Sequence, residues 1–99
     1  MSFPRAWIGE IARHEGQDVE LRGWLDAKRS SGKLHFLQVR DGTGVIQCVV
    51  FKGDVSEEVF DEARHLPQES AIKVRGTVKA DPRSPIGYEI SVKDMEVVS

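Results

Sequence analysis

The spacing of its strand-like segments is the feature that most constrains this chain. Five segments alternate apolar with polar residues, the period-2 pattern of a strand with one face on a hydrophobic core. They cover residues 17–28, 34–40, 45–51, 70–79 and 88–92, with a last apolar stretch beyond them. The turn RDGTG at residues 40–44 is short enough for a hairpin, so we expect the second and third strands to be antiparallel neighbours.

Two helical segments accompany the strands. Residues 4–14 predict a short N-terminal helix, because their apolar residues recur on one helical face. The second helix follows the third strand, where we expect Asp54 to be the N-cap and Glu57 its capping-box partner. Its apolar stripe consists of Val55, Val59, Phe60 and Ala63, and it ends at Leu66 and Pro67.

A helix between the third and fourth of five strands is the layout of the OB-fold, a Greek-key barrel. We therefore predict an all-β fold, with a helical segment over residues 1–16 and a five-stranded barrel over residues 17–99. A chain of 99 residues, 39% of them hydrophobic, suffices for one domain with one core. In this fold the second and third strands, with adjacent loops, form the ligand face.

Strand phase selects the residues that face outward, if the more uniformly apolar faces point inward. Phe36 falls on the opposite face from Leu37 and Val39, and the same alternation turns Gln47 and Glu89 outward. An outward aromatic can stack on a base, and an amide and a carboxylate can read base edges. The alternative stays open that Phe36 packs beneath a helix or loop and that the two polar residues are simply solvated.

The charge distribution favours a local contact with a polyanion. The net charge of −2 argues against wholesale non-specific binding of nucleic acid. Residues 22–40 nevertheless contain five basic side chains and one acid, whereas residues 52–69 contain six acids and two basic side chains. The five are Arg22, Lys28, Arg29, Lys33 and Arg40.

Signals for catalysis, metal binding or membrane insertion are weak. His14, His35 and His65 lack metal-ligand spacing, and the phase of His35 predicts a packed or hydrogen-bonded ring. Cys48 lies in an apolar run, which predicts a buried, inert thiol. No apolar run approaches the roughly 20 residues of a membrane helix, and no signal peptide pattern begins the chain, so we expect a cytoplasmic protein.

Two stretches carry a resemblance to a known family: VELRGWLDAKRSSGKLHFLQVRDGTGVIQCVVF and KVRGTVKADPRSPIGYEISVKDMEVVS. Together they resemble the N-terminal anticodon-binding domain of class IIb aminoacyl-tRNA synthetases, the aspartyl, asparaginyl and lysyl enzymes. The resemblance extends from about Trp7 to Ser99. RSSGKLHFLQVRDGTG looks most like the asparaginyl enzymes, because Ser30 follows Arg29 where aspartyl enzymes more often have an aspartate. The aspartyl class stays an alternative.

The resemblance implies roles for four residues. Phe36 matches the aromatic that stacks on the central anticodon uracil, and Gln47 matches the residue that hydrogen-bonds it. Arg29 matches a basic residue on the anticodon-loop backbone. Glu89 matches the carboxylate that reads the first anticodon base, a guanine or its modified form.

The resemblance also implies the partners. The basic loop, with Lys28 and Lys33, would contact phosphates of a tRNA anticodon loop, and a synthetase catalytic domain would be the protein partner. No membrane is involved, and full-length family members are typically dimers. No catalytic residue or cofactor is expected on this chain, because ATP and magnesium belong with the catalytic domain. Two other functions stay open: sequence-tolerant single-strand binding, and a protein-interaction or dimerisation module.

Overall fold

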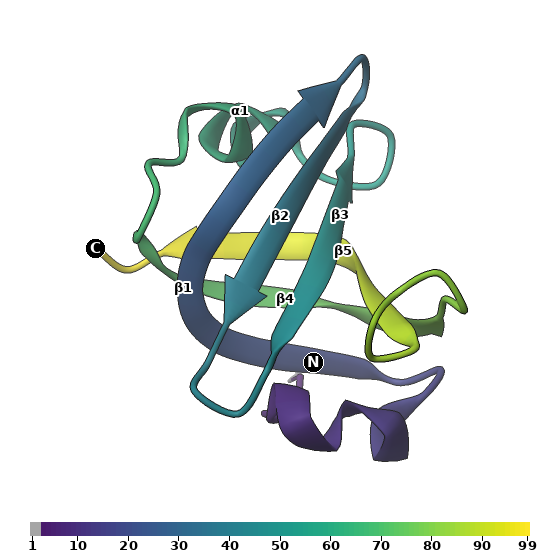
Figure 1. The fold of residues 1–99 in the computed structure, drawn as a ribbon. Coiled ribbons are helices and arrows are strands. Elements are labelled where there is room, and N and C mark those ends of the chain that lie inside the picture. Colours follow the sequence, from purple (N-terminus) through teal and green to yellow (C-terminus); the bar gives the residue numbers. More distant parts are fainter. Residues whose placement is uncertain (1–2) are drawn as a thin grey trace.

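A computed structural model describes residues 3–99 as a closed five-stranded barrel (Figure 1). The strands are β1 (Asp18–Ser31), β2 (Leu34–Arg40), β3 (Val45–Phe51), β4 (Ala71–Ala80) and β5 (Tyr88–Val97). Their order around the barrel is β1-β2-β3-β5-β4, in which only the β3–β5 pair is parallel. The predicted all-β, five-stranded OB-fold is confirmed.

The long strand β1 bends so that its first half pairs with β4 and its second half with β2. The bend lies at Gly23 and Trp24, where β1 leaves β4 and meets β2, and a register shift follows between Leu25 and Ala27. Glycine is needed at this point because a Cβ on residue 23 would lie 2.2 Å from the carbonyl oxygen of Arg40. It therefore allows β1 to pass close to the end of β2. β1 continues to Ser31, three residues beyond the predicted end of the first strand at residue 28, so the turn before β2 is short.

The N-terminal helix is shorter than predicted and is a 3-10 helix, η1 (Ile8–His14). It begins later than residue 4 because Arg5 forms a parallel bridge with Glu20 of β1, and backbone hydrogen bonds of Glu20 to Pro4 and Ala6 hold residues 4–6 along β1. Its buried residues Ile8 and Ile11 belong to the same hydrophobic cluster as the barrel interior. The N-terminal segment and the barrel therefore share one core.

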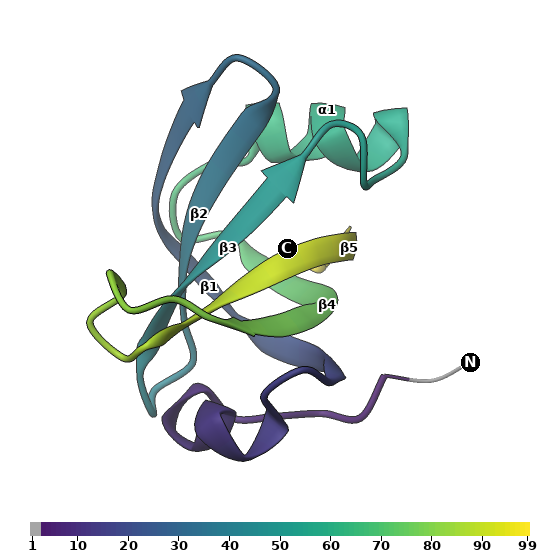
Figure 2. The same cartoon turned by 90° about the vertical axis from the view of Figure 1, so that its right-hand side faces the viewer.

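Helix α1 (Glu57–His65) follows β3, as predicted, but Asp54 does not cap it. The N-cap is Ser56, whose Oγ accepts a hydrogen bond from the amide of Val59 at 3.1 Å. Asp54 lies in the preceding turn, where its amide donates to the carbonyl of Phe51. Helix α1 lies at one end of the barrel and η1 at the other (Figure 2). No helix within residues 3–99 is long and apolar enough to span a membrane.

Candidate nucleic-acid interface

The outer face of the barrel carries two transverse rows of side chains. The first row, in register across β1, β2, β3 and β5, consists of Arg29, Phe36, Val49 and Ser91. The second row consists of Ala27, Gln38, Gln47, Glu89 and, on β4, Lys79. Residues between the rows, such as Leu37 and Cys48, are fully buried. The structure thus places Phe36, Gln47 and Glu89 on one outer face, as strand phase predicts.

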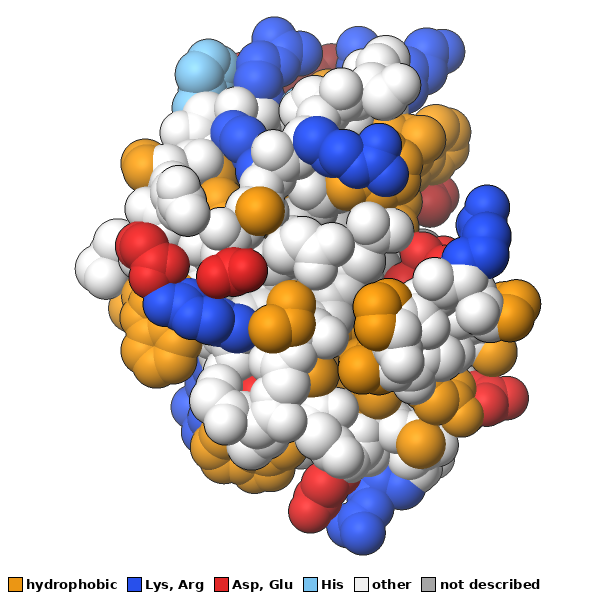
Figure 3. All heavy atoms as spheres, viewed as in Figure 1, with side chains coloured by type: hydrophobic (Ala, Val, Ile, Leu, Met, Phe, Trp, Pro, Cys, Tyr) orange, Lys and Arg blue, Asp and Glu red, His pale blue; other side chains and the backbone are white. Residues whose placement is uncertain are grey.

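A groove of about 780 Å³ lies over these rows. The sheet forms one wall, and the loop between β4 and β5 forms the other, with Arg83 and Ile86 among its lining residues. In Figure 3 the groove is the hollow between the sheet and the lobe at the lower right, where Figure 1 shows this loop. Basic side chains gather above it, near the β1–β2 turn. A volume of this size falls within the range, roughly 300–1,000 Å³, of sites for small organic molecules.

Arg29 and Phe36 form a unit within the groove. They are cross-strand partners, and the guanidinium carbon of Arg29 lies 4.2 Å from the centroid of the Phe36 ring. Such a cation–π contact contributes about 0.5–1 kcal/mol at an exposed site. Because the guanidinium lies over the ring, a base that stacks here shares the ring face with Arg29 or stacks on the guanidinium plane itself.

Gln47 lies between Gln38 and Glu89 in the second row, and all three side chains line the groove. A glutamine offers two donors and an acceptor, whereas an ionised carboxylate only accepts. The row therefore places Gln47, which can both donate and accept hydrogen bonds, one strand away from Glu89, which only accepts them when ionised. Phe36 is two residues from Gln38 along β2 and on the same face, so an aromatic surface adjoins these polar groups.

Comparison with known proteins assigns the chain to a family. The OB-fold nucleic acid binding domain family matches residues 19–98. The chain belongs to this family. Among curated proteins, this OB-fold domain is 58% identical over 95 residues to an asparagine–tRNA ligase of Thermus thermophilus. That match covers 96% of this chain and 22% of the ligase, so the domain spans about a fifth of that relative.

Solved structures agree with this assignment. The asparaginyl-tRNA synthetase of Pyrococcus horikoshii matches 99% of the domain and 24% of its own chain, with a TM-score of 0.90 and 39% identity. An aspartyl-tRNA synthetase of Entamoeba histolytica matches 98% of the domain and 22% of its own chain, with a TM-score of 0.87 but 27% identity. The predicted resemblance to class IIb synthetases, and to the asparaginyl enzymes most of all, is confirmed.

The five basic residues of the segment 22–40 separate into two groups: three contact other groups of the protein, and two lie at the groove or in the β1–β2 turn. Lys28 points away from the groove, and its Nζ donates to the carbonyls of Ala63 and Arg64 at the end of α1, at 3.2 and 2.5 Å. This contact places a cation at the negative end of the helix. Arg22 pairs with Glu20 at 2.7 Å, and Arg40 pairs with Glu69 and Asp26. Arg29 and the exposed Lys33 of the β1–β2 turn complete the predicted five.

Sequence reasoning missed three groove or row residues: Gln38, Lys79 and Arg83. Gln38 has the same phase as Phe36, so the alternation already contains the signal that finds it. Lys79 depends on the β4–β5 register, which pairs it with Glu89. Arg83, whose side chain is 90% exposed, lies in a loop that has no periodicity.

His35 and Cys48 are interior residues of the barrel. The His35 ring packs 4.2 Å from the Phe60 ring, and its Nδ1 lies 2.6 Å from the Ser30 hydroxyl. Burial lowers the pKa of His35, and the charges of Lys28 and Arg64 lower it further. Burial raises the pKa of the Cys48 thiol, so it stays protonated. The predictions of a packed histidine and a buried thiol are confirmed.

Proposed function

We propose that this OB-fold domain recognises the anticodon of tRNA-Asn, G-U-U, as the anticodon-binding part of an asparagine–tRNA ligase. The observation that supports it is the placement of Phe36, Gln47 and Glu89 together in one groove. The 58% identity to an asparagine–tRNA ligase supports the choice of amino acid.

The groove suits a splayed anticodon loop. The central uracil stacks on Phe36, while the Gln47 amide donates to a uracil carbonyl and accepts from its N3–H. Glu89, the neighbour of Gln47 on β5, accepts from the N1–H and N2–H₂ of the first-position guanine. Arg29 and Lys33 supply phosphate contacts, which position the loop without reading its sequence.

We assign no cofactor to this chain. The adenylation chemistry belongs with the larger part of the ligase. The purified chain should therefore show no asparagine-dependent ATP–pyrophosphate exchange, and exchange above background would contradict this assignment.

Binding to three anticodon stem-loops tests the proposal. The asparagine loop (G-U-U) differs from the lysine loop (U-U-U) only at the first base and from the aspartate loop (G-U-C) only at the third, on one common stem. We expect the asparagine loop to bind tighter than the lysine loop by about 1–3 kcal/mol, the usual range for one well-placed base contact. Glu89→Ala should remove that difference, because its carboxylate reads the guanine.

The rival functions give different results in the same experiment. Equal affinity for all three loops indicates sequence-tolerant single-strand binding. A preference for the aspartate loop over the asparagine loop indicates the aspartyl class. Absence of any salt-dependent RNA binding contradicts the proposal and leaves a protein-interaction module.

A further inference from the structure

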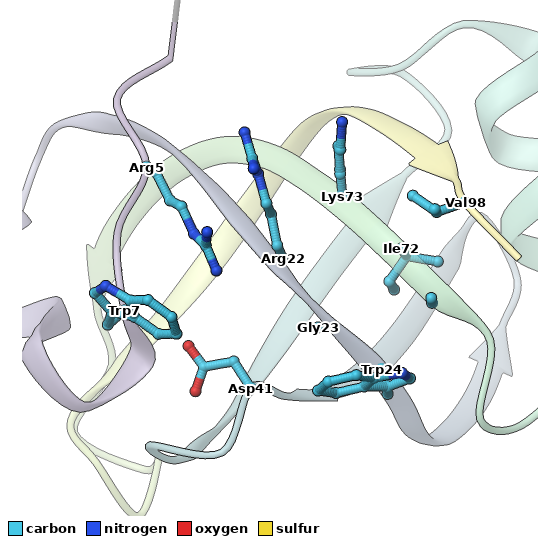
Figure 4. Close-up of a pocket in the computed structure, with 10 residues that line it drawn as sticks. Arg5, Trp7, Arg22, Gly23, Trp24, Asp41, Ile72, Lys73 and Val98 are labelled. Atoms are coloured by element: carbon cyan, nitrogen blue, oxygen red, sulfur yellow. The ribbon is translucent and has the colours of Figure 1, made fainter.

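A second concavity, of about 360 Å³, shares no lining residue with the groove. We call it the tryptophan pocket. Its walls include Trp7, Trp24, Ile72 and Val98, and the cationic side chains at its rim include Arg5 and Lys73. Figure 4 shows the two indole rings on either side of Gly23, with Arg5 and Val98 at opposite edges. Segments from both ends of the chain thus meet at one surface.

The two tryptophans are unusually accessible for their type. Trp7 is 43% exposed and Trp24 46% exposed, and they are the only tryptophans in the sequence. Tryptophan is enriched among the residues that dominate protein–protein binding energy, and exposed apolar patches mark interaction sites. Stacked arginines cover the rings only in part: the Arg5 guanidinium lies 4.3 Å from the Trp7 ring centroid and that of Arg40 5.8 Å from the Trp24 ring centroid.

The charges at the rim are unbalanced. Among the ion pairs formed within residues 3–99, none includes Arg5 or Lys73. Asp41 lines the pocket, but its carboxylate accepts hydrogen bonds from the amides of Ile8 and Thr43, each at 2.9 Å. An occupant that matches this surface is apolar at its centre and carries carboxylates at its edge.

We infer that the tryptophan pocket packs against the remainder of an asparagine–tRNA ligase, through an apolar protein segment flanked by acidic side chains. This inference rests on the proposed function in taking the chain as part of such a ligase. In the Pyrococcus horikoshii synthetase the match is 24% of the chain, so about three quarters of that protein lies outside it. A domain joins the rest of its chain near its first or last residues. Because Arg5 and Val98 both line the pocket, either connection brings the remainder beside it.

RNA is a poorer match to this surface than a protein segment. Both surfaces place arginines over aromatic rings, so stacking alone does not separate them. Within the described part of the chain, the lining of the tryptophan pocket contains no amide side chain, and its carboxylate, Asp41, already accepts hydrogen bonds from two backbone amides, whereas the groove offers Gln47 and Glu89 to base edges. The two sites therefore divide the surface of the barrel between RNA and protein.

Hydroxyl-radical footprinting read by mass spectrometry measures the exposure of the pocket. Three samples are compared: this chain alone, this chain saturated with the asparagine stem-loop, and the Thermus thermophilus ligase whose matching segment is replaced by this chain. We expect oxidation of Trp7 and Trp24 to fall several-fold in the hybrid ligase and to stay unchanged with the stem-loop. Phe51, which is 40% exposed and lines neither site, is the internal control for the comparison of the chain with the hybrid and should react equally in those two samples. It is not used for the stem-loop sample, because its cross-strand partner Leu34 lines the groove.

A charge reversal at the rim tests the acidic character of the occupant. Lys73→Glu in the hybrid should return the tryptophans to the oxidation rate of the isolated chain, whereas Lys52→Glu, an exposed lysine outside the pocket, should not. Equal tryptophan oxidation in chain and hybrid overturns the inference. Protection by the stem-loop overturns it in favour of RNA, and protection that grows with the concentration of the isolated chain overturns it in favour of a second copy.

The same samples separate this inference from the proposed function. Shielded tryptophans in a hybrid whose domain binds no stem-loop support the protein contact and contradict anticodon binding. Stem-loop binding with freely oxidised tryptophans in the hybrid supports anticodon binding and contradicts the protein contact at the tryptophan pocket.

Discussion

The groove and the tryptophan pocket are built partly on the same strand but differ in chemistry. β1 contributes Arg29 to the groove and Trp24 to the pocket. The groove places amide and carboxylate groups beside one aromatic ring, and the pocket places two indole rings beneath a cationic rim. Sites with polar groups in fixed register reject molecules that leave those groups unpaired, whereas apolar surfaces discriminate weakly. We therefore expect substitutions in the groove to change which RNA binds, and those in the pocket to change how firmly a protein packs.

The largest expected effect is a disturbance of both regions together, through Gly23→Ala. Gly23 lies where β1 leaves β4 and meets β2, and the new methyl group would lie 2.2 Å from a backbone oxygen, which no rotamer change relieves. Overpacking of this kind lowers the free energy of unfolding by about 1–3 kcal/mol. Urea denaturation measures the loss. Gly32→Asn is the control, because it has open space and a φ of 57° that asparagine tolerates.

A variant as stable as the wild type would show that β1 has room to shift at this point. In that case the bend would not fix the relative placement of the two sites. Stem-loop affinity and tryptophan oxidation would then also stay at their wild-type values.

Phe36→Ala should affect the groove alone. The ring is a stacking surface, worth roughly 1–3 kcal/mol per base by alanine substitution, and stacking accepts any base. The variant should bind all three stem-loops more weakly while keeping their order of affinity. Fluorescence anisotropy measures the affinities. A large fall in Tm with unchanged binding would mean that Phe36 is a packing residue and that no base lies on it.

The alternation of the strands made the centre of the groove predictable. The bounds of β2 and β3 agree with those predicted, and a period of 2 then fixes the faces of Phe36 and Gln47. Glu89 follows from the same rule, although its position beside Gln47 depends on the parallel β3–β5 pairing.

Features set by tertiary contacts were not predictable in this way. Lys28 belongs to the basic run in the sequence, but its hydrogen bonds reach carbonyls 35 and 36 residues further along the chain. Asp54 and Ser56 are both acceptable caps by residue type, and the turn after β3 decides between them. The loop wall with Arg83 has no periodic pattern to read.

Gln47→Ala should reduce selectivity more than affinity. The amide matches both the carbonyl and the N3–H of uracil, whereas cytosine presents an acceptor at N3 and leaves the glutamine carbonyl unpaired. Loss of the side chain should therefore remove a uracil-over-cytosine preference of about 1–3 kcal/mol at the central base. Binding to two stem-loops that differ only there measures it. Gln38→Ala, from the same row, is the matched control and should keep the preference.

Arg29→Ala and Lys28→Ala compare neighbours on opposite faces of β1. Each phosphate contact contributes about 0.7 to the log–log slope of affinity against salt for single strands. Arg29→Ala should reduce the slope by that amount, and Lys28→Ala should leave it unchanged while lowering Tm, because its ammonium group binds the end of α1. A reduced slope for Lys28→Ala would show that this lysine leaves the helix to contact RNA.

The smallest expected effect arises behind the groove, at His35. Its pKa lies below the usual 6.5 because burial disfavours the charged ring, so the unfolded chain binds more protons than the native state below that pH. The free energy of unfolding should accordingly fall as the pH drops below 6.5. Urea denaturation at several pH values between about 5 and 6.5 measures how the free energy of unfolding depends on pH. Carboxylates titrate mainly below this range. His35→Asn, which has no titrating ring, should flatten the slope. Equal slopes in the wild type and His35→Asn would show that the ring gains a proton as readily in the barrel as in water. Stem-loop selectivity should be constant across this range in every variant, because His35 faces α1 and the groove side chains lie on the other side of β2.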